Sequence, residues 1–174
     1  EENWTNFFSR NADDDALRSA DENVALTRYG RDPGAAQAYA WDTVPSAEDK
    51  YARWNTSVTG ASAADDYRNE INGQGYMTEI DPYNPNSVIK KRSSMGRMAH
   101  EGAAFSLPVV GQPLAIYMGD DARGEYIYKF VSTAVWSAAD ANRADRMAVG
   151  DKYLDSGSLY AAKLDADGNG TWLA

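Results

Sequence analysis

Residues 96–132 decide the fold of this chain and read GRMAHEGAAFSLPVVGQPLAIYMGDDARGEYIYKFVS. Two apolar runs in this stretch, 114–118 and 126–132, have the composition of β-strands. The segment between them is rich in glycine and aspartate, which favour tight turns. The stretch therefore predicts a pair of β-strands joined by a turn.

Carboxylates flank the first of these two runs. Glu101 comes before it, and Asp120 and Asp121 follow it directly. Acidic side chains at strand ends, beside glycines, are a common way for a β scaffold to present oxygen ligands to a hard cation. Aspartate and glycine also favour turns for purely local reasons, so a solvated hairpin turn is the alternative interpretation.

The second half of the chain contains more strand-like segments of this kind. They are separated by turns rich in Gly, Asp and Pro, and residues 134–148 form a helical or loop insertion among them. Short strands at regular spacing are typical of an antiparallel all-β fold of the sandwich, barrel or propeller type. The further predicted strands are 75–80, 87–95, 159–164 and 171–173.

The first half has a weaker pattern. Short helices are predicted at 16–18, 35–40 and 47–54, and the remaining segments are irregular. The acidic cluster 13–15 could hold calcium, but a solvated helix start is the preferred interpretation.

Residues 165–170 match the first half of a calcium-binding EF-hand loop, with Asp165, Asp167 and Asn169 at the ligand positions. An EF-hand loop needs a helix before it, whereas 159–164 has a strand pattern. We therefore predict a β-turn.

The composition excludes several functional classes. The chain has 174 residues, the size of one domain, with 26 Asp and Glu against 17 Lys and Arg and a net charge of −9. Without a basic block, nucleic acid is not an expected partner. No apolar run is long enough to span a bilayer. The lack of cysteine excludes disulfides and thiolate metal sites within these residues.

Several motifs, taken in order, resemble the PhoX-type bacterial alkaline phosphatases. The motifs are Glu79-Ile80-Asp81-Pro82, His100-Glu101-Gly102-Ala103, Tyr117-Met118-Gly119-Asp120-Asp121, Glu125-Tyr126-Ile127-Tyr128-Lys129-Phe130-Val131-Ser132 and Leu159-Tyr160-Ala161-Ala162-Lys163-Leu164-Asp165. The resemblance covers residues 69–174 well and 1–68 thinly, through Glu1-Glu2-Asn3 and Arg28-Tyr29-Gly30.

The resemblance implies a mainly β fold that is part of a six-bladed β-propeller, about two blades with their insertions. Residues 1–174 would then be a piece of one propeller domain, irregular over 1–68 and strand-rich over 69–174. An isolated pair of blades leaves sheet faces uncovered, so we expect residues 1–174 alone to fold poorly and to be inactive.

The family implies an exported, periplasmic or extracellular enzyme, monomeric at full length, that hydrolyses phosphate monoesters with ferric iron and calcium. Matched to its motifs, Glu101 is a metal ligand and Asp120 a calcium ligand. The family's Cys-Glu-Glu-Asn motif places an iron-binding cysteine immediately before Glu1. His100 neighbours Glu101 on a strand and so points to the opposite face, which favours packing or a supporting role over metal ligation.

Carboxylates suit both cations, because hard oxygen ligands bind hard cations. A non-catalytic β-propeller relative that binds calcium is the alternative hypothesis. It shares the fold but lacks the cysteine and the arginine donors that the enzyme carries elsewhere.

Overall fold

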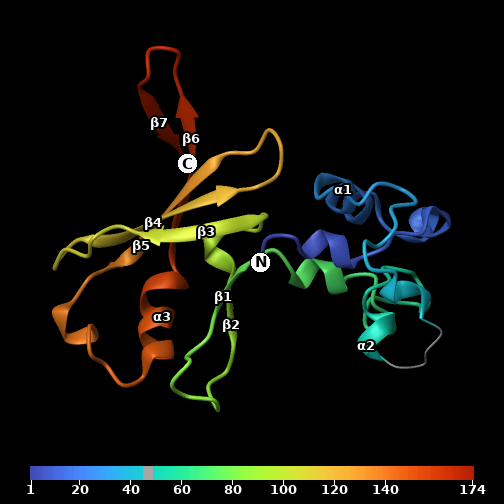
Figure 1. The fold of residues 1–174 in the computed structure, drawn as a ribbon, viewed down its shortest axis with the longest axis horizontal. Coiled ribbons are helices and arrows are strands. Elements are labelled where there is room, and N and C mark those ends of the chain that lie inside the picture. The colour runs from blue at the N-terminus through green and yellow to red at the C-terminus, as the bar shows by residue number, and fades with distance from the viewer. Residues whose placement is uncertain (45–48) are drawn as a thin grey trace. The chain divides into compact units, whose positions relative to one another are not determined.

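The computed structural model describes residues 1–44 and 49–174, and these form two compact units (Figure 1). One unit contains Asn3–Gln74, and the other contains Glu1–Glu2 with Gly75–Ala174. The second unit holds all the strands named in the described residues, in two antiparallel sheets. The prediction of a mainly β chain with antiparallel strands is confirmed.

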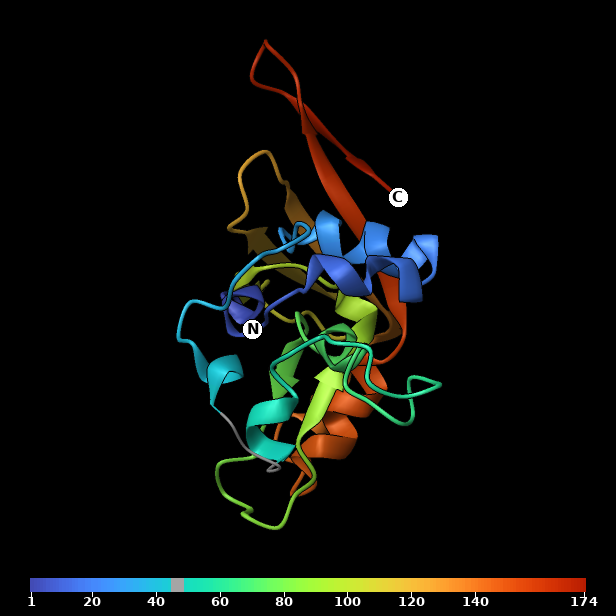
Figure 2. The same cartoon turned by 90° about the vertical axis from the view of Figure 1, so that its right-hand side faces the viewer.

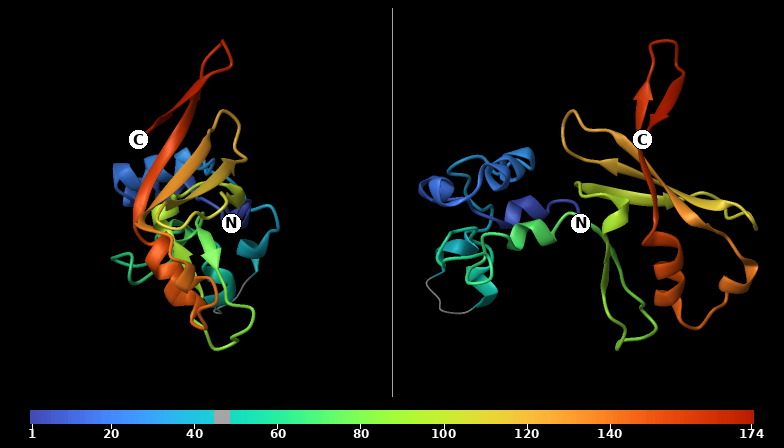
Figure 3. Two further views of the ribbon diagram at one scale, coloured as in Figure 1. Left: turned by 90° about the vertical axis from the view of Figure 1, so that its left-hand side faces the viewer. Right: turned by 180° about the vertical axis from the view of Figure 1, so that it is seen from behind.

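The larger sheet has five strands in the order β3-β4-β5-β6-β7, so each strand pairs with its neighbour in the chain. The strands are β3 (His100–Phe105), β4 (Pro113–Asp120), β5 (Ile127–Val135), β6 (Gly157–Leu164) and β7 (Gly170–Leu173). The β6–β7 hairpin extends beyond the other strands of this sheet (Figures 2 and 3). A two-stranded sheet pairs β1 (Met77–Glu79) with β2 (Lys90–Arg92).

Alternation along β4 creates the core of this unit. Leu114, Ile116 and Met118 are buried, whereas the intervening Tyr117 is exposed, as expected for a strand with one covered face. Phe130 of β5 and Met95 join Ile116 and Met118 in one apolar cluster. Met77 of β1 and Leu154 of helix α3 (Arg146–Leu154) pack on this cluster, so α3 and the small hairpin lie on the same face of the sheet (Figure 1).

A buried arginine links the small hairpin to α3. Arg92 is 2% exposed, and its guanidinium donates to Glu79 of β1 at 2.7 Å and to Asp151 of α3 at 2.9 Å. It also donates to Asp155 at 2.6 Å. The packing is close, because a Cβ at Gly150 would collide with the Glu79 and Arg92 side chains.

The other unit, Asn3–Gln74, consists of short helices and irregular segments around a small aromatic core. Its core residues are Trp4, Phe8, Leu26 and Ile71. Its helices are η1 (Trp4–Phe7), η2 (Ala12–Leu17), α1 (Ala20–Arg28), η3 (Trp41–Thr43), α2 (Asp49–Ala52) and η4 (Glu70–Gly73).

Helix α1 was not among the predicted helices, although its start carries a recognisable signal. Ser19 accepts from Glu22 N, and the Glu22 carboxylate accepts from Ser19 N, which is a complete capping box. The predicted helix at 16–18 is a 3₁₀-helix that starts earlier, at Ala12, after the N-cap Asn11.

The predicted helix at 35–40 is wrong. Tertiary hydrogen bonds use its backbone instead, with Arg10 N donating to Ala35 O at 2.8 Å and Ala38 N to Asn6 O at 2.9 Å. Ala40 is left-handed, with φ of 54°. The predicted helix at 47–54 lies partly outside the described residues, and α2 covers Asp49–Ala52 of it.

The predicted strands at 75–80, 87–95, 159–164 and 171–173 correspond to β1, β2, β6 and β7, with β1 and β2 shorter than expected. The predicted insertion at 134–148 begins within β5, and its helix lies further along, as α3. No finding tests the single-domain interpretation or the number of propeller blades, and both stay predictions.

Candidate metal centre

The register of β3 and β4 brings Glu101 and Asp120 to the same end of the sheet. His100 pairs directly with Asp120, and Gly102 pairs with Gly119. The register shifts between these two pairs, so Glu101 is the extra residue of a β-bulge. A Cβ built on Gly119 would lie 3.9 Å from Glu101 Oε2. The Glu101 carboxylate therefore lies over Gly119, the residue next to Asp120.

Neither carboxylate is neutralised by a cation of the described residues. Glu101 is exposed and Asp120 is half-buried, and neither forms an ion pair within residues 1–44 and 49–174. One oxygen of Asp120 accepts from Ala122 N at 3.0 Å. The other lone pairs of the two carboxylates remain available, which fits a hard cation that takes oxygen ligands.

The hydrogen bond from Ala122 also keeps the alternative interpretation open. An aspartate that accepts from the backbone two residues later forms an Asx-turn, which favours aspartate at this position without any metal. The turn continues through Gly124, whose φ of 81° is left-handed. Arg123 is exposed in this turn.

His100 lies on the same face of the strand pair as Asp120 and is 4% exposed. Its Nε2 is 3.1 Å from Gly96 O, a carbonyl that can only accept, so Nε2 carries the proton. Nδ1 is then an acceptor, and it has no hydrogen-bond partner among the described residues. Burial lowers the pKa of His100, which favours this neutral form.

The start of the chain joins the same region. His100 N donates to Glu1 O at 3.1 Å. The Glu1 carboxylate accepts from Gly75 N at 2.7 Å and Tyr76 N at 3.0 Å, and it pairs with Lys91 at 2.9 Å. The Glu1 carboxylate oxygens are thus engaged within the protein. The Glu1 backbone contacts His100, the residue immediately before Glu101.

The donor set is incomplete for a cation. Across residues 1–44 and 49–174, no group of three or more His, Cys, Asp or Glu side chains is arranged to hold a metal ion. Calcium takes six to eight oxygen ligands. Glu101 and Asp120 fit as part of a coordination shell, whose other ligands must come from elsewhere.

The other two acidic clusters are used structurally. Asp15 accepts from Arg10 at 2.9 Å and from Arg18 at 3.0 Å, and Asp14 accepts from Val58 N. Asp167 accepts from the backbone and side chain of Asn169, which lowers the pKa of Asp167. Strand β6 and not a helix precedes the 165–170 turn, so the predicted β-turn is confirmed there.

None of the helices in the described ranges is long and apolar enough to cross a membrane.

Comparison with known proteins adds two findings. The family described as alkaline phosphatase PhoX matches residues 1–174. The chain is also similar to a solved structure titled "Pseudomonas fluorescens PhoX in complex with vanadate, a transition state analogue", with a TM-score of 0.70 and 33% identity. The match covers 99% of this chain and 27% of that chain, so the present chain spans about a quarter of the length of its relative. No curated protein matches.

Proposed function

Because this chain belongs to the alkaline phosphatase PhoX family, we propose that it is an internal part of an enzyme that hydrolyses phosphate monoesters. In this proposal the chain contributes two ligands, Glu101 and Asp120, to a centre that holds calcium and ferric iron. The remaining ligands would come from other parts of the protein, which makes residues 1–174 alone inactive. We further propose an exported, periplasmic or extracellular protein that is monomeric at full length.

The observation that carries the proposal is the position of the two carboxylates. The β-bulge places Glu101 over Gly119, at the same end of the β3–β4 pair as Asp120, and neither side chain has a cationic partner in the part of the chain that the structure describes.

The chemistry of the donors suits the proposed cations. When bound, calcium and ferric iron would act as Lewis acids that withdraw charge from the phosphoryl oxygens and activate an oxygen nucleophile. Glu101 and Asp120 would hold the cations through hard carboxylate oxygens. The β3–β4 pairing would fix the spacing of the two ligands, and the buried His100 ring would support the strand end from below.

The solved relative supports the phosphoryl-transfer part of the proposal, since it was determined in complex with vanadate, a transition state analogue. We therefore expect vanadate to inhibit the intact protein.

The test is metal analysis together with p-nitrophenyl phosphate hydrolysis on the intact protein. We expect iron and calcium in the wild type, and less calcium with a rate at least about 100-fold lower in Asp120→Asn, since a metal ligand that is also needed for transition-state charge is lost. Glu101→Gln should lower both metal content and rate.

Asp121→Asn is the matched control, because Asp121 is exposed in the same turn but is not a proposed ligand. It should leave metal content and rate nearly unchanged. Unchanged metal and rate in both Glu101→Gln and Asp120→Asn would refute the assignment. Calcium without iron, and no turnover in the wild type, would instead support the non-catalytic calcium-binding relative.

A further inference from the structure

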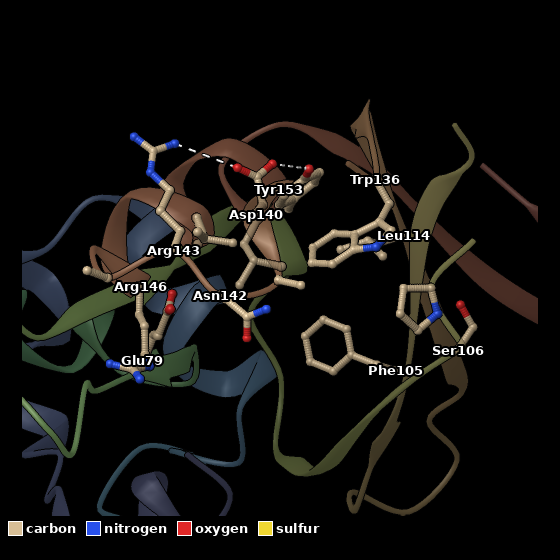
Figure 4. Close-up of a pocket in the computed structure, with 16 residues that line it drawn as sticks. Glu79, Phe105, Ser106, Leu114, Trp136, Asp140, Asn142, Arg143, Arg146 and Tyr153 are labelled. Carbon is tan, nitrogen blue, oxygen red and sulfur yellow. Dashed lines mark hydrogen bonds and ion pairs between the residues drawn. The ribbon is translucent and has the colours of Figure 1, made fainter. Parts of the chain in front are cut away.

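A pocket of about 500 Å³ lies at the opposite end of β3 from Glu101 (Figure 4). It is lined by the end of β3, the start of β4, the segment after β5 and helix α3. Phe105, which lines it, is four residues along the strand from Glu101, or about 13 Å at the usual strand rise. The pocket is therefore separate from the candidate metal centre.

The apolar wall of the pocket is held in place by hydrogen bonds. The Trp136 and Tyr153 rings lie 5.3 Å apart, and Tyr153 is 1% exposed. The Tyr153 hydroxyl donates to Asp140 at 2.6 Å and accepts from Ser137 N at 3.1 Å. Trp136 N donates to Gln112 O at 2.8 Å. These bonds fix the positions of Trp136 and Tyr153 relative to each other.

The two carboxylates in the lining are paired with cations. Glu79 accepts from Arg92 at 2.7 Å, and Asp140 accepts from Lys152 at 2.6 Å. Neither Arg92 nor Lys152 lines the pocket, so each carboxylate has a cationic partner outside the lining, and Arg92 is shared with Asp151 and Asp155.

Arg146 and Asn142 keep unused hydrogen-bonding capacity. The Arg146 side chain is 53% exposed, with an ion pair to Asp81 at 3.8 Å and its guanidinium stacked over Tyr83. Neither Arg146 nor Asn142 makes a side-chain hydrogen bond with another residue of ranges 1–44 and 49–174. In Figure 4 these two side chains lie across the pocket from Phe105 and Trp136, whereas the Arg143 guanidinium extends away from it.

We propose that this pocket binds a small aromatic anion. The ring system would contact Phe105 and Trp136, and a carboxylate or sulfonate on it would face Asn142 and Arg146. The volume suits a two-ring ligand, since ligand pockets usually measure 300–1,000 Å³. Aromatic rings prefer offset or edge contacts with other rings, and guanidinium is the strongest side-chain partner for a carboxylate.

The test is calorimetric titration of the intact protein with 2-naphthoate and with its neutral analogue naphthalene-2-carboxamide. For a ligand of this size we expect a Kd on the order of 1 mM or tighter for the anion, and about tenfold weaker binding of the amide. Arg146→Gln should abolish this tenfold preference. Arg143→Gln is the matched control and should retain it.

Variants that fill or alter the pocket test whether naphthoate binds there and not at another site. Ala141 lines the pocket and is exposed, so Ala141→Trp should fill the space without disturbing the core and weaken naphthoate binding at least tenfold. Phe105→Ala provides a second variant, because Phe105 is 59% exposed and its truncation should be tolerated. Leu107→Ala, at a 90% exposed residue outside the lining, should leave binding unchanged.

Asp120→Asn should also leave naphthoate binding unchanged, since the anion does not bind at the candidate metal centre. The proposal is overturned if naphthoate does not bind at about 10 mM, as expected if another segment of the protein fills the pocket. It is equally overturned if Ala141→Trp and Phe105→Ala bind as well as wild type.

Discussion

His100 and Asp120 are directly paired across β3 and β4, so their side chains lie on the same face of the strand pair. The ring is buried, and the carboxylate above it is half-buried. The hydrogen bond from Nε2 to Gly96 O holds the ring in this position. This arrangement anchors the end of the β3–β4 pair at the point where Glu101 leaves the regular ladder.

The first prediction tests which ring nitrogen of His100 stabilises the strand end. His100→Gln places an amide NH₂ near the Nε2 position and should keep the bond to Gly96 O. His100→Asn is too short to reach and should cost about 1 kcal/mol more, the usual net value of one hydrogen bond. Hydrogen exchange of residues 96–102 in the intact protein measures the difference. Equal protection in the two variants would contradict the assignment.

The second prediction concerns two glycines with left-handed φ but different surroundings. Gly96 has φ of 89°, and a Cβ there would lie 2.8 Å from both Leu159 Cδ2 and Met98 Cε. Gly124 has φ of 81° and open space around it. Gly96→Ala should cost about 2–4 kcal/mol, from backbone strain and overpacking together, whereas Gly124→Ala should cost only about 1 kcal/mol.

Urea denaturation of the intact protein gives the free energy of unfolding for both glycine variants. If Gly96→Ala is no more destabilising than Gly124→Ala, the close packing of Leu159 and Met98 around Gly96 is not rigid.

The sequence predicted most of the sheet but not the strand that carries Glu101. The β4 and β5 segments have apolar runs that indicate strands, whereas β3 contains Gly102, Ala103 and Ala104, residues with little strand preference. Hydrogen bonding to β4 holds residues 100–105 in a strand conformation that their intrinsic preferences do not favour. The bulge at Glu101 depends on the register between the two strands, which no local pattern specifies.

The alanine-rich segment 35–40 shows the opposite failure. Alanine is the best helix former, so local preference favoured a helix there. In the folded unit, Ala35 O and Ala38 N instead bond to Arg10 and Asn6, near the start of the chain. A tertiary partner that is distant in sequence therefore outweighed an intrinsic preference of a few tenths of a kcal/mol per residue.

The third prediction concerns Arg92, which joins the β1–β2 hairpin to α3. Arg92→Met keeps the apolar stem but removes charged hydrogen bonds to Glu79, Asp151 and Asp155, so we expect a loss of about 2–3 kcal/mol. The cost stays below that of a fully buried pair because Asp155 is 54% exposed and regains water.

Lys90→Met is the matched control for Arg92→Met. Lys90 pairs with Asp151 at the surface, where one ion pair contributes at most about 1 kcal/mol. Hydrogen exchange of α3 should therefore increase strongly in Arg92→Met and slightly in Lys90→Met. Similar exchange in both variants would mean that Arg92 does not anchor the helix.

The last prediction uses the pH dependence of the Asn3–Gln74 unit. The Asp66 carboxylate accepts from the Arg68 guanidinium at 2.6 Å and from Thr59 N and Gly60 N at 3.1 and 3.0 Å. The bonds to Arg68 hold the pKa of Asp66 well below its usual range. A carboxyl whose pKa is lowered by folding stabilises the protein above its unfolded pKa of about 3.9. This stabilisation is lost as the pH falls towards the folded pKa.

Asp66→Asn should thus destabilise residues 57–68 by about 2 kcal/mol at neutral pH, and the difference from wild type should shrink steadily below about pH 4. Ser62→Ala is the control, because it removes the hydrogen bonds of the Ser62 hydroxyl with the exposed Asp65 and with Ala64 N and leaves Asp66 intact. Local hydrogen exchange of the intact protein between about pH 2.5 and 7 measures both variants, after correction for intrinsic exchange rates. A difference between Asp66→Asn and wild type that stays constant down to pH 2.5 would show that the charge on Asp66 does not stabilise this loop.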